Sequence, residues 1–306
     1  MYTHHAEEFA GKKVVEFKDA SSWQGPDVAY RVRVEWDDNI SVVERLASLL
    51  EQEGAGQLTH LLLGFWDNRA EDEDSGELVQ FVVDHADQLS NLMALFLGDI
   101  IFEEQEVSWI RQSNVTPLLD ALPNLQWLQI RGGNELSFAR TSHAALRTLI
   151  IESGGLPRSV LREIALCDFP ALEHLELHLG DQTYGWDGTV DDLRPFLSGE
   201  RYPNLRYLGL RDSDIADEVA AIVVNAPVIK RIETLDLSLG NISEAGARSL
   251  MMLPTDGQLK RLVVSHHYIP ADVVAQLQQS LPFEVIADEP QDLDDNEDWR
   301  PVMHSE

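Results

Sequence analysis

The 306-residue sequence has a single cysteine, few basic residues and no long hydrophobic run. With Cys167 alone, neither a disulfide framework nor a thiolate zinc cluster can form within the chain, which favours a reducing compartment. Lys and Arg total 23 against 53 Asp and Glu, a formal net charge of −30. This charge disfavours nucleic-acid and anionic-membrane partners, because the averaged field repels phosphate groups.

No apolar segment approaches the roughly 18 residues that a membrane span needs. The N-terminal residues also lack the basic-then-apolar order of a signal peptide. These two absences predict a cytoplasmic protein.

Motifs of common catalytic and cofactor sites are absent too. The sequence has no G-x-S-x-G, H-E-x-x-H, G-x-G-x-x-G or phosphate-binding G-x-x-x-x-G-K-[ST] motif. The acidic run Glu71–Asp74 lacks the ligand spacing of a calcium loop, and we expect residues 67–77 to form a solvated loop. Cys167 lies in an apolar helical stretch and is expected to be buried. The sequence therefore predicts no catalytic residue, no metal site and no cofactor.

What the sequence does contain is a repeated pattern, L-x-x-L-x-L, with aliphatic residues replacing leucine at some positions. Matches begin at Leu58, Leu92, Leu125, Leu146, Leu172, Leu205, Ile232 and Leu259. Each match predicts a short strand, and segments of helical period such as ELVQFVVDHADQL and ADVVAQLQQSL lie between them. A strand and helix of this size cannot bury their apolar faces alone, so successive units must stack.

The pattern resembles the leucine-rich repeat, and the resemblance covers residues 56–288. In the best match, Ile242 follows Leu237 by five positions, and Gly246-Ala247 precedes Leu250, as in ribonuclease-inhibitor-like repeats. The chain is similar in this respect to leucine-rich-repeat families of bacterial cytoplasmic proteins. The resemblance implies an α/β solenoid with a curved parallel sheet inside and helices outside. The family's asparagine ladder is missing, since the corresponding position after Leu237 holds Gly240.

The domain organisation follows from this interpretation. Residues 1–55 are expected to form an N-terminal cap, with strands near 14–17 and 28–36 and a helix over 41–54. Residues 56–288 form the solenoid of about eight repeats and its last strand. Residues 289–306 contain seven acidic residues and one Arg, a composition that predicts a disordered tail.

Side chains alternate between the two faces of a strand, so residues between the buried leucines should line the concave face. The resemblance implies that this face binds a protein or peptide, and large aromatic and Arg side chains favour such binding. The predicted partner-binding residues are Phe96, Trp127, Gln129, Arg131, His174, Glu176, Tyr207, Arg211, Asp236 and Arg261. Phe96, Leu62 and Ile150 would leave an apolar patch on this face, unless the acidic loop or the tail covers it.

Two other functions remain open at this point. His60, His174, Glu176 and His178 also fall on the predicted concave face, so a metal-dependent enzyme is the first alternative. Neighbouring same-face residues on one strand are roughly 6.5 to 7 Å apart, which is awkward for one tetrahedral ion. The second alternative is a polyanion mimic that binds a basic partner, supported by the net charge alone.

Overall fold

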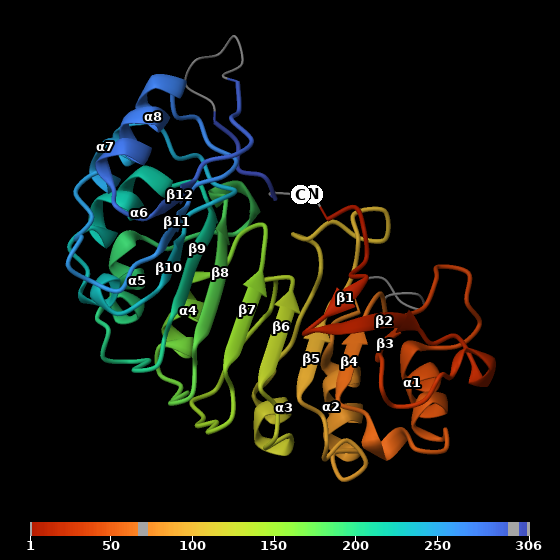
Figure 1. Cartoon of the computed structure of the whole chain (residues 1–306). Helices are drawn as coiled ribbons and strands as arrows, with labels where there is room; N and C mark the ends of the chain where they lie inside the picture. The colour runs from red at the N-terminus through yellow and green to blue at the C-terminus, as the bar shows by residue number, and fades with distance from the viewer. Residues whose placement is uncertain (1, 67–72, 293–299, 305–306) are drawn as a thin grey trace. The chain divides into compact units, whose positions relative to one another are not determined.

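The computed structural model describes residues 2–66, 73–292 and 300–304. The chain divides into two compact units, which we describe separately. Unit 1 comprises Met1–Glu152 and Leu166–Pro170, and unit 2 comprises Ser153–Ala165 and Ala171–Glu306. Each unit alternates short strands with helices, so the α/β class predicted from the sequence is confirmed (Figure 1).

Unit 1 is built on parallel strands that pair in sequence order from β2 to β7. Its strands are β1 (Glu8–Phe9), β2 (Lys12–Glu16), β3 (Ala29–Val32), β4 (His60–Leu63), β5 (Ala94–Leu97), β6 (Trp127–Arg131) and β7 (Thr148–Glu152). Its helices are α1 (Val42–Leu50), α2 (Gly76–Asp84) and α3 (Thr116–Ala121). Strand β1 differs from the rest because it pairs antiparallel with β2.

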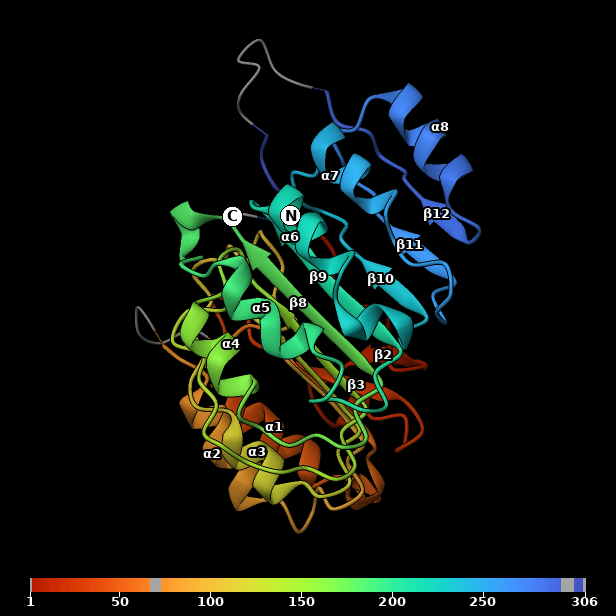
Figure 2. The same ribbon diagram turned by 90° about the vertical axis from the view of Figure 1, so that its left-hand side faces the viewer.

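Unit 2 repeats the arrangement, with parallel pairing from β8 to β12. Its strands are β8 (His174–Gly180), β9 (Tyr207–Ser213), β10 (Thr234–Asp236), β11 (Arg261–Val263) and β12 (Glu284–Ile286). Its helices are α4 (Arg158–Ile164), α5 (Val190–Leu197), α6 (Ala216–Val223), α7 (Glu244–Leu250) and α8 (Ala271–Ser280). The helices lie over one face of these strands, as Figure 2 shows for α5 to α8.

The repeated leucines form the core, as the L-x-x-L-x-L pattern predicts. In β4 to β11 or directly after each strand, the second and third apolar positions of the pattern are at most 1% exposed, from Leu61 and Leu63 to Leu262 and Val264. Partners align in register: Leu208 pairs with Leu175 on one side and with Leu235 on the other. Because every strand offers the same aliphatic positions to its neighbours, the core is continuous across the strands of a unit.

The strands expected in the N-terminal region are confirmed as β2 and β3, and the expected helix as α1. Ser41 begins α1 with a capping box, in which its side chain accepts from Glu44 N and the Glu44 carboxylate accepts from Ser41 N. Strands β2 and β3 continue the parallel pairing into β4, so residues 12–32 extend the sheet of unit 1. Helix α3, which begins with Pro at its first turn, was not predicted.

The acidic tail was expected to be unpacked, and this expectation is wrong for residues 300–304. Val302 and His304 are buried, Tyr268 Oη donates to Pro301 O at 2.9 Å, and Met303 N donates to Leu239 O at 2.9 Å. Residues 293–299, including Trp299, lie outside the described residues. So do residues 67–72 of the predicted acidic loop, whose described end enters helix α2 with Ser75 buried.

Cys167 is fully buried, as expected. Within the described ranges, no helix is long and apolar enough to cross a membrane.

Candidate functional site

The residues between the core leucines lie on the opposite face of the strands, which we call the open face. The ten residues predicted to bind a partner are all on it, and they divide between the units. Phe96, Trp127, Gln129 and Arg131 belong to unit 1, and the remaining six belong to unit 2. We describe the two groups in turn, because they differ in how much of their surface is accessible.

In unit 2, β8, β9 and β10 bring five of the six residues together around the Glu176 carboxylate. His178 Nε2 lies 2.9 Å from Glu176 Oε1, and His174 Nε2 lies 3.3 Å from Oε2. Arg211 Nη1 donates to Oε1 at 2.5 Å. An ionised carboxylate only accepts hydrogen bonds, so both imidazole nitrogens are the donors here.

Tyr207 connects this cluster to the next strand. Its ring stacks on His174 with centroids 3.9 Å apart and planes inclined by 6°, and its hydroxyl donates to Asp236 Oδ2 at 2.7 Å. Arg211 extends the link, because its Nε donates to Ser238 Oγ at 2.9 Å. Contacts between adjacent strands thereby hold Glu176, Tyr207 and Arg211, which fixes the direction of their polar groups.

Gly209 makes the close approach of these side chains possible. It pairs with Glu176 in the strand register, and it lies on the open face between Tyr207 and Arg211. A Cβ at this position would come within 3.1 Å of both Glu176 Cγ and Tyr207 Cε1. A side chain here would therefore push apart the residues that the cluster brings together.

The electrostatics of the cluster favour fixed charges over proton transfer. Burial alone would raise the pKa of Glu176, but the hydrogen bonds from His174 and His178 and the charge of Arg211 hold it well below its ordinary value. Burial and the nearby carboxylates of Glu176 and Asp236 raise the pKa of Tyr207 far above its ordinary value. Near neutral pH, Glu176 therefore stays ionised and Tyr207 stays protonated.

Exposure within the cluster is uneven. Glu176 and Asp236 are buried, contrary to the expectation that they face a partner directly, while the side chains of His174 and Arg211 remain 28% and 22% exposed. Arg261 is half exposed but does not join the cluster, because its Nε donates to Glu284 Oε2 at 2.7 Å. The accessible part of the site is thus His174, Tyr207 and Arg211, positioned by buried acids.

In unit 1 the predicted apolar patch is buried. Phe96 and Leu62 are at most 1% exposed and Ile150 is 8% exposed, so the expectation of an open patch is wrong. Phe9 of β1 covers part of it, with ring centroids 5.9 Å from Phe96 and 6.0 Å from Trp127. The cover over Phe96 is therefore the N-terminal segment, and not the acidic loop or the tail that we considered.

Arg131 is buried as well, so its guanidinium is not open to solvent as a place on the concave surface had led us to expect. Its Nε donates to Glu152 Oε2 at 2.6 Å, its Nη1 donates to Ile100 O at 2.6 Å, and the Tyr2 ring lies 3.8 Å from the guanidinium carbon. Gln129 Nε2 donates to the other oxygen of Glu152 at 2.9 Å. Desolvation lowers the pKa of Arg131, but Glu152, Tyr2 and Asp99 together outweigh it and raise the pKa.

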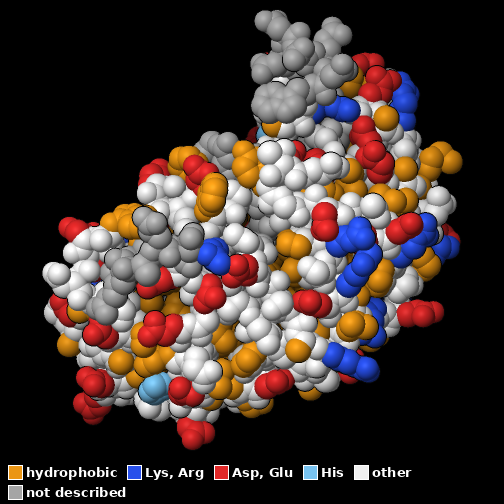
Figure 3. Space-filling model, turned by 180° about the vertical axis from the view of Figure 1, so that it is seen from behind, with side chains coloured by type: hydrophobic (Ala, Val, Ile, Leu, Met, Phe, Trp, Pro, Cys, Tyr) orange, Lys and Arg blue, Asp and Glu red, His pale blue; other side chains and the backbone are white. Residues whose placement is uncertain are grey.

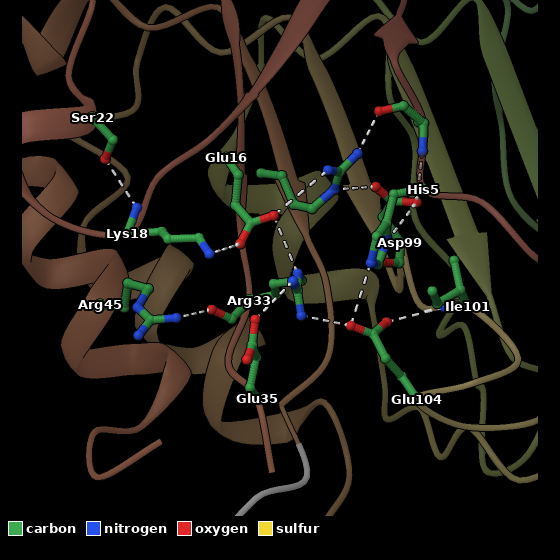
Figure 4. A network of polar contacts seen from close by, with 12 residues as sticks. His5, Glu16, Lys18, Ser22, Arg33, Glu35, Arg45, Asp99, Ile101 and Glu104 are labelled. Carbon is green, nitrogen blue, oxygen red and sulfur yellow. Dashed lines mark hydrogen bonds and ion pairs between the residues drawn. The ribbon is translucent and has the colours of Figure 1, made fainter. Parts of the chain in front are cut away.

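A network of charged residues continues from this point across unit 1 (Figure 4). Asp99, which is fully buried, accepts from Arg31 Nε at 2.6 Å. Arg33 lies 3.3 Å from Glu16 and 2.8 Å from Glu104. Acidic and basic side chains therefore alternate across the unit, from Glu16 on β2 through Arg31 and Asp99 to Arg131 and Glu152.

His5 joins this network and was missed by sequence reasoning. Its Nε2 lies 3.3 Å from Glu104 Oε1 and its Nδ1 lies 3.1 Å from Asp99 O. Burial lowers the pKa of His5, but Asp99 and Glu104 outweigh burial and raise it to about 9. The only signal in the sequence was the His4-His5 pair, and nothing local connects it to Asp99.

Sequence reasoning also missed the contact between Asp212, at the end of β9, and His304 near the C-terminus. Asp212 is fully buried with a left-handed φ of 53°, and its Oδ1 accepts from His304 N at 2.9 Å. Its other oxygen has no hydrogen-bond partner among the described residues. Burial raises the pKa of Asp212 to about 6.

The donors needed for a metal centre are not grouped suitably in the part of the chain that the structure describes. No set of three or more His, Cys, Asp and Glu residues there could hold a metal ion. His60, which we considered as a ligand with the His174 cluster, belongs to unit 1 and lies with its Nε2 3.2 Å from Ala10 O.

Fold and site together define an α/β protein of consecutive strand–helix units, with networks of polar contacts on the open strand face. No protein-family model matches the chain, and no curated protein matches it. Among solved structures, a crystal structure of a protein from Bacteroides fragilis is 30% identical, with a TM-score of 0.82. The match covers 91% of this chain and 78% of that one. The chain therefore belongs to the same family as this Bacteroides fragilis protein.

Proposed function

We propose that the protein is a cytoplasmic, non-enzymatic scaffold of the leucine-rich-repeat type, which binds a protein or peptide on the concave, open face of its strands. The buried leucine positions of β4 to β11 support the repeat interpretation. Ile242 and Ile269 support it as well, because each lies five positions after the last apolar position of its strand pattern, in successive repeats, and both are buried.

One observation carries the binding proposal. In unit 1, three of the residues predicted to bind a partner already contact a polypeptide segment, since residues 2–9 lie against Phe96, Trp127 and Arg131. The open face therefore offers contacts suited to a peptide. In unit 2, His174, Tyr207 and Arg211 are partly accessible and are held in place by their neighbours. They are aromatic and cationic side chains, as are Phe96, Trp127 and Arg131 in unit 1.

The test is affinity capture from the native cell with the tagged full chain, comparing wild type with the double variant Tyr207→Ala and Arg211→Ala. The double variant should lose at least one captured protein that the wild type retains. Arg248→Ala is the matched control, because Arg248 is a half-exposed residue on helix α7 whose ion pair is local. An unchanged set of captured proteins, with both variants folded, would contradict binding through this face.

The two alternative functions gain less support. A metal-dependent enzyme would need free ligands, whereas the Glu176 carboxylate contacts His174, His178 and Arg211. Metal analysis of the untagged protein would test it. A polyanion mimic would need an uninterrupted acidic surface, whereas Figure 3 shows Lys and Arg side chains gathered over part of unit 2 beside acidic ones. Among the ion pairs of unit 2, Arg206 and Lys260 both pair with Glu233.

A further inference from the structure

The N-terminal segment, residues 2–10, lies on the open face of unit 1 through three side chains. Tyr2, His5 and Phe9 contact the face, while Thr3, His4, Glu7 and Glu8 between them are exposed. Only the two residues of β1 pair with another strand. Outside β1 the segment is held by these side chains and by single backbone hydrogen bonds, such as Phe102 N to Tyr2 O at 2.7 Å and Val14 N to Glu7 O at 2.8 Å. An extended bound peptide is held by the same two kinds of contact.

Phe9 is the apolar anchor. It is 4% exposed and packs into a cluster with Ala29, Leu62, Ala94 and Phe96. All four belong to the open face, so without Phe9 this apolar surface would be uncovered. Trp127 and His60 meet the edges of the Phe9 ring at centroid distances of 6.0 and 6.2 Å.

His5 is the charged anchor. It lies between Asp99 and Glu104, and the adjoining Ala6 N donates to Asp99 Oδ1 at 3.3 Å. Arg31 also donates to Ala6 O. The face thus presents two carboxylates to an imidazole or basic side chain and polar partners to the neighbouring peptide groups.

The segment is accessible along one side. It joins β2 through a tight hairpin turn in which Ala10 and Gly11 have φ values of 46° and 81°. A hollow of about 480 Å³ also lies beside it, lined by His4, Glu7, Lys13 and Arg31 among others. The segment is therefore incompletely enclosed on that side.

We propose that residues 2–10 are an intramolecular competitor for the open face of unit 1, displaced by an extended polypeptide that presents an aromatic side chain to the Phe96 cluster and a basic or imidazole side chain to Asp99 and Glu104. This inference rests on the proposed function and adds regulation and partner chemistry to it. The competitor is tethered next to its site, so it acts at a high effective concentration and masks the face from ligands in solution.

The experiment uses the full chain carrying His5→Ala and Phe9→Ala, with a fluorescent peptide of sequence YTHHAEEFA as the probe. The variant should bind the peptide at least about tenfold more tightly than wild type does, because weakening the internal competitor raises the fraction of chains with an open face. The matched protein control is Thr3→Ala with Glu8→Ala, two exposed positions of the same segment, which should behave as wild type. The matched peptide control is YTHHAEEAA, which should bind weakly.

Absence of peptide binding by a folded His5→Ala, Phe9→Ala variant would overturn the inference. If that variant does not fold, hydrogen exchange of the wild-type chain decides: the amides of Ala6 and Val14 must exchange at least about 100-fold faster than those of β4 and β5. Equal protection would also overturn it. Either failure leaves the proposed function testable, because the capture experiment depends on Tyr207 and Arg211 in unit 2.

Discussion

The backbone N–H of His304 donates to Oδ1 of Asp212 at 2.9 Å, across 92 positions of sequence. This contact places a C-terminal peptide group over a carboxylate that is fully buried at the end of β9. It therefore couples the packing of residues 300–304 to the charge state of Asp212.

The first prediction is that Asp212 makes folding less favourable as pH rises from about 4 to about 6. Burial raises its pKa from 3.8 to about 6 in the folded chain, so the folded state binds more protons in this range and the free energy of unfolding falls with pH. Asp212→Asn keeps an oxygen acceptor for His304 and removes the charge. At pH 7 the variant should be more stable, by on the order of 3 kcal/mol at most. Urea unfolding of both proteins between pH 4 and 7 measures the difference, which should shrink toward pH 4.

The second prediction concerns His5, whose pKa is raised from 6.5 to about 9. Its contribution to stability should be fully present below pH 6.5 and should be lost as pH rises through 9. His5→Gln should therefore be less stable than wild type at pH 6, by about 1–2 kcal/mol after allowance for solvent screening. The unfolding free energies of the two proteins should become equal near pH 10. Urea unfolding at both pH values tests this. A difference in unfolding free energy that stays constant with pH would contradict the stabilisation of charged His5 by Asp99 and Glu104.

The third prediction tests the core register. Leu208→Ala and Leu235→Ala should each cost about 2–5 kcal/mol of unfolding free energy, because both leucines are fully buried and pair with each other. Met252→Ala is the control: that side chain is 74% exposed and should change stability by less than about 0.5 kcal/mol. Thermal and urea unfolding provide the measurement, and wild-type melting of both leucine variants would contradict the assigned register.

The fourth prediction concerns the C-terminal residues. Val302 is buried beside the contacts of Tyr268 and Leu239 with this segment. Val302→Ala should therefore cost about 1–2 kcal/mol, the value of the methyl groups removed. Limited proteolysis should then cleave this region faster than in wild type. An unchanged melting temperature and cleavage rate would indicate that residues 300–304 do not contribute to stability.

The strands could be predicted from the sequence because the repeat encodes them locally. Leu175 and Leu177 stand two positions apart with a polar residue between them, and this spacing alone identifies a strand with one buried face. Helix α5 could be predicted for a similar reason, since Val190, Leu193 and Leu197 recur at helical spacing. Helix α3 is only six residues long, too short for a period to be recognised.

The cover on the open face could not be predicted in the same way. Phe9 and Phe96 meet through tertiary packing, and neither residue's neighbours in sequence encode the other. The same holds for His5 and Asp99, and for His304 and Asp212. Alternation along a strand predicted which face of the strand each binding residue lies on. Whether that side chain is accessible depends on segments from elsewhere in the chain that cover the face.

The alternating charges of unit 1 also bear on how the unit assembles. Strands β4 to β7 offer nearly identical leucines to their neighbours. The core by itself therefore discriminates poorly between the correct strand pairing and a pairing shifted by one strand–helix repeat. Arg31, Asp99, Arg131 and Glu152 differ in sign from one contact to the next. A shifted pairing would leave these poorly solvated charges without their partners, at a considerable electrostatic cost. The salt bridges thus favour the observed order of the strands, and the leucines supply the cohesion.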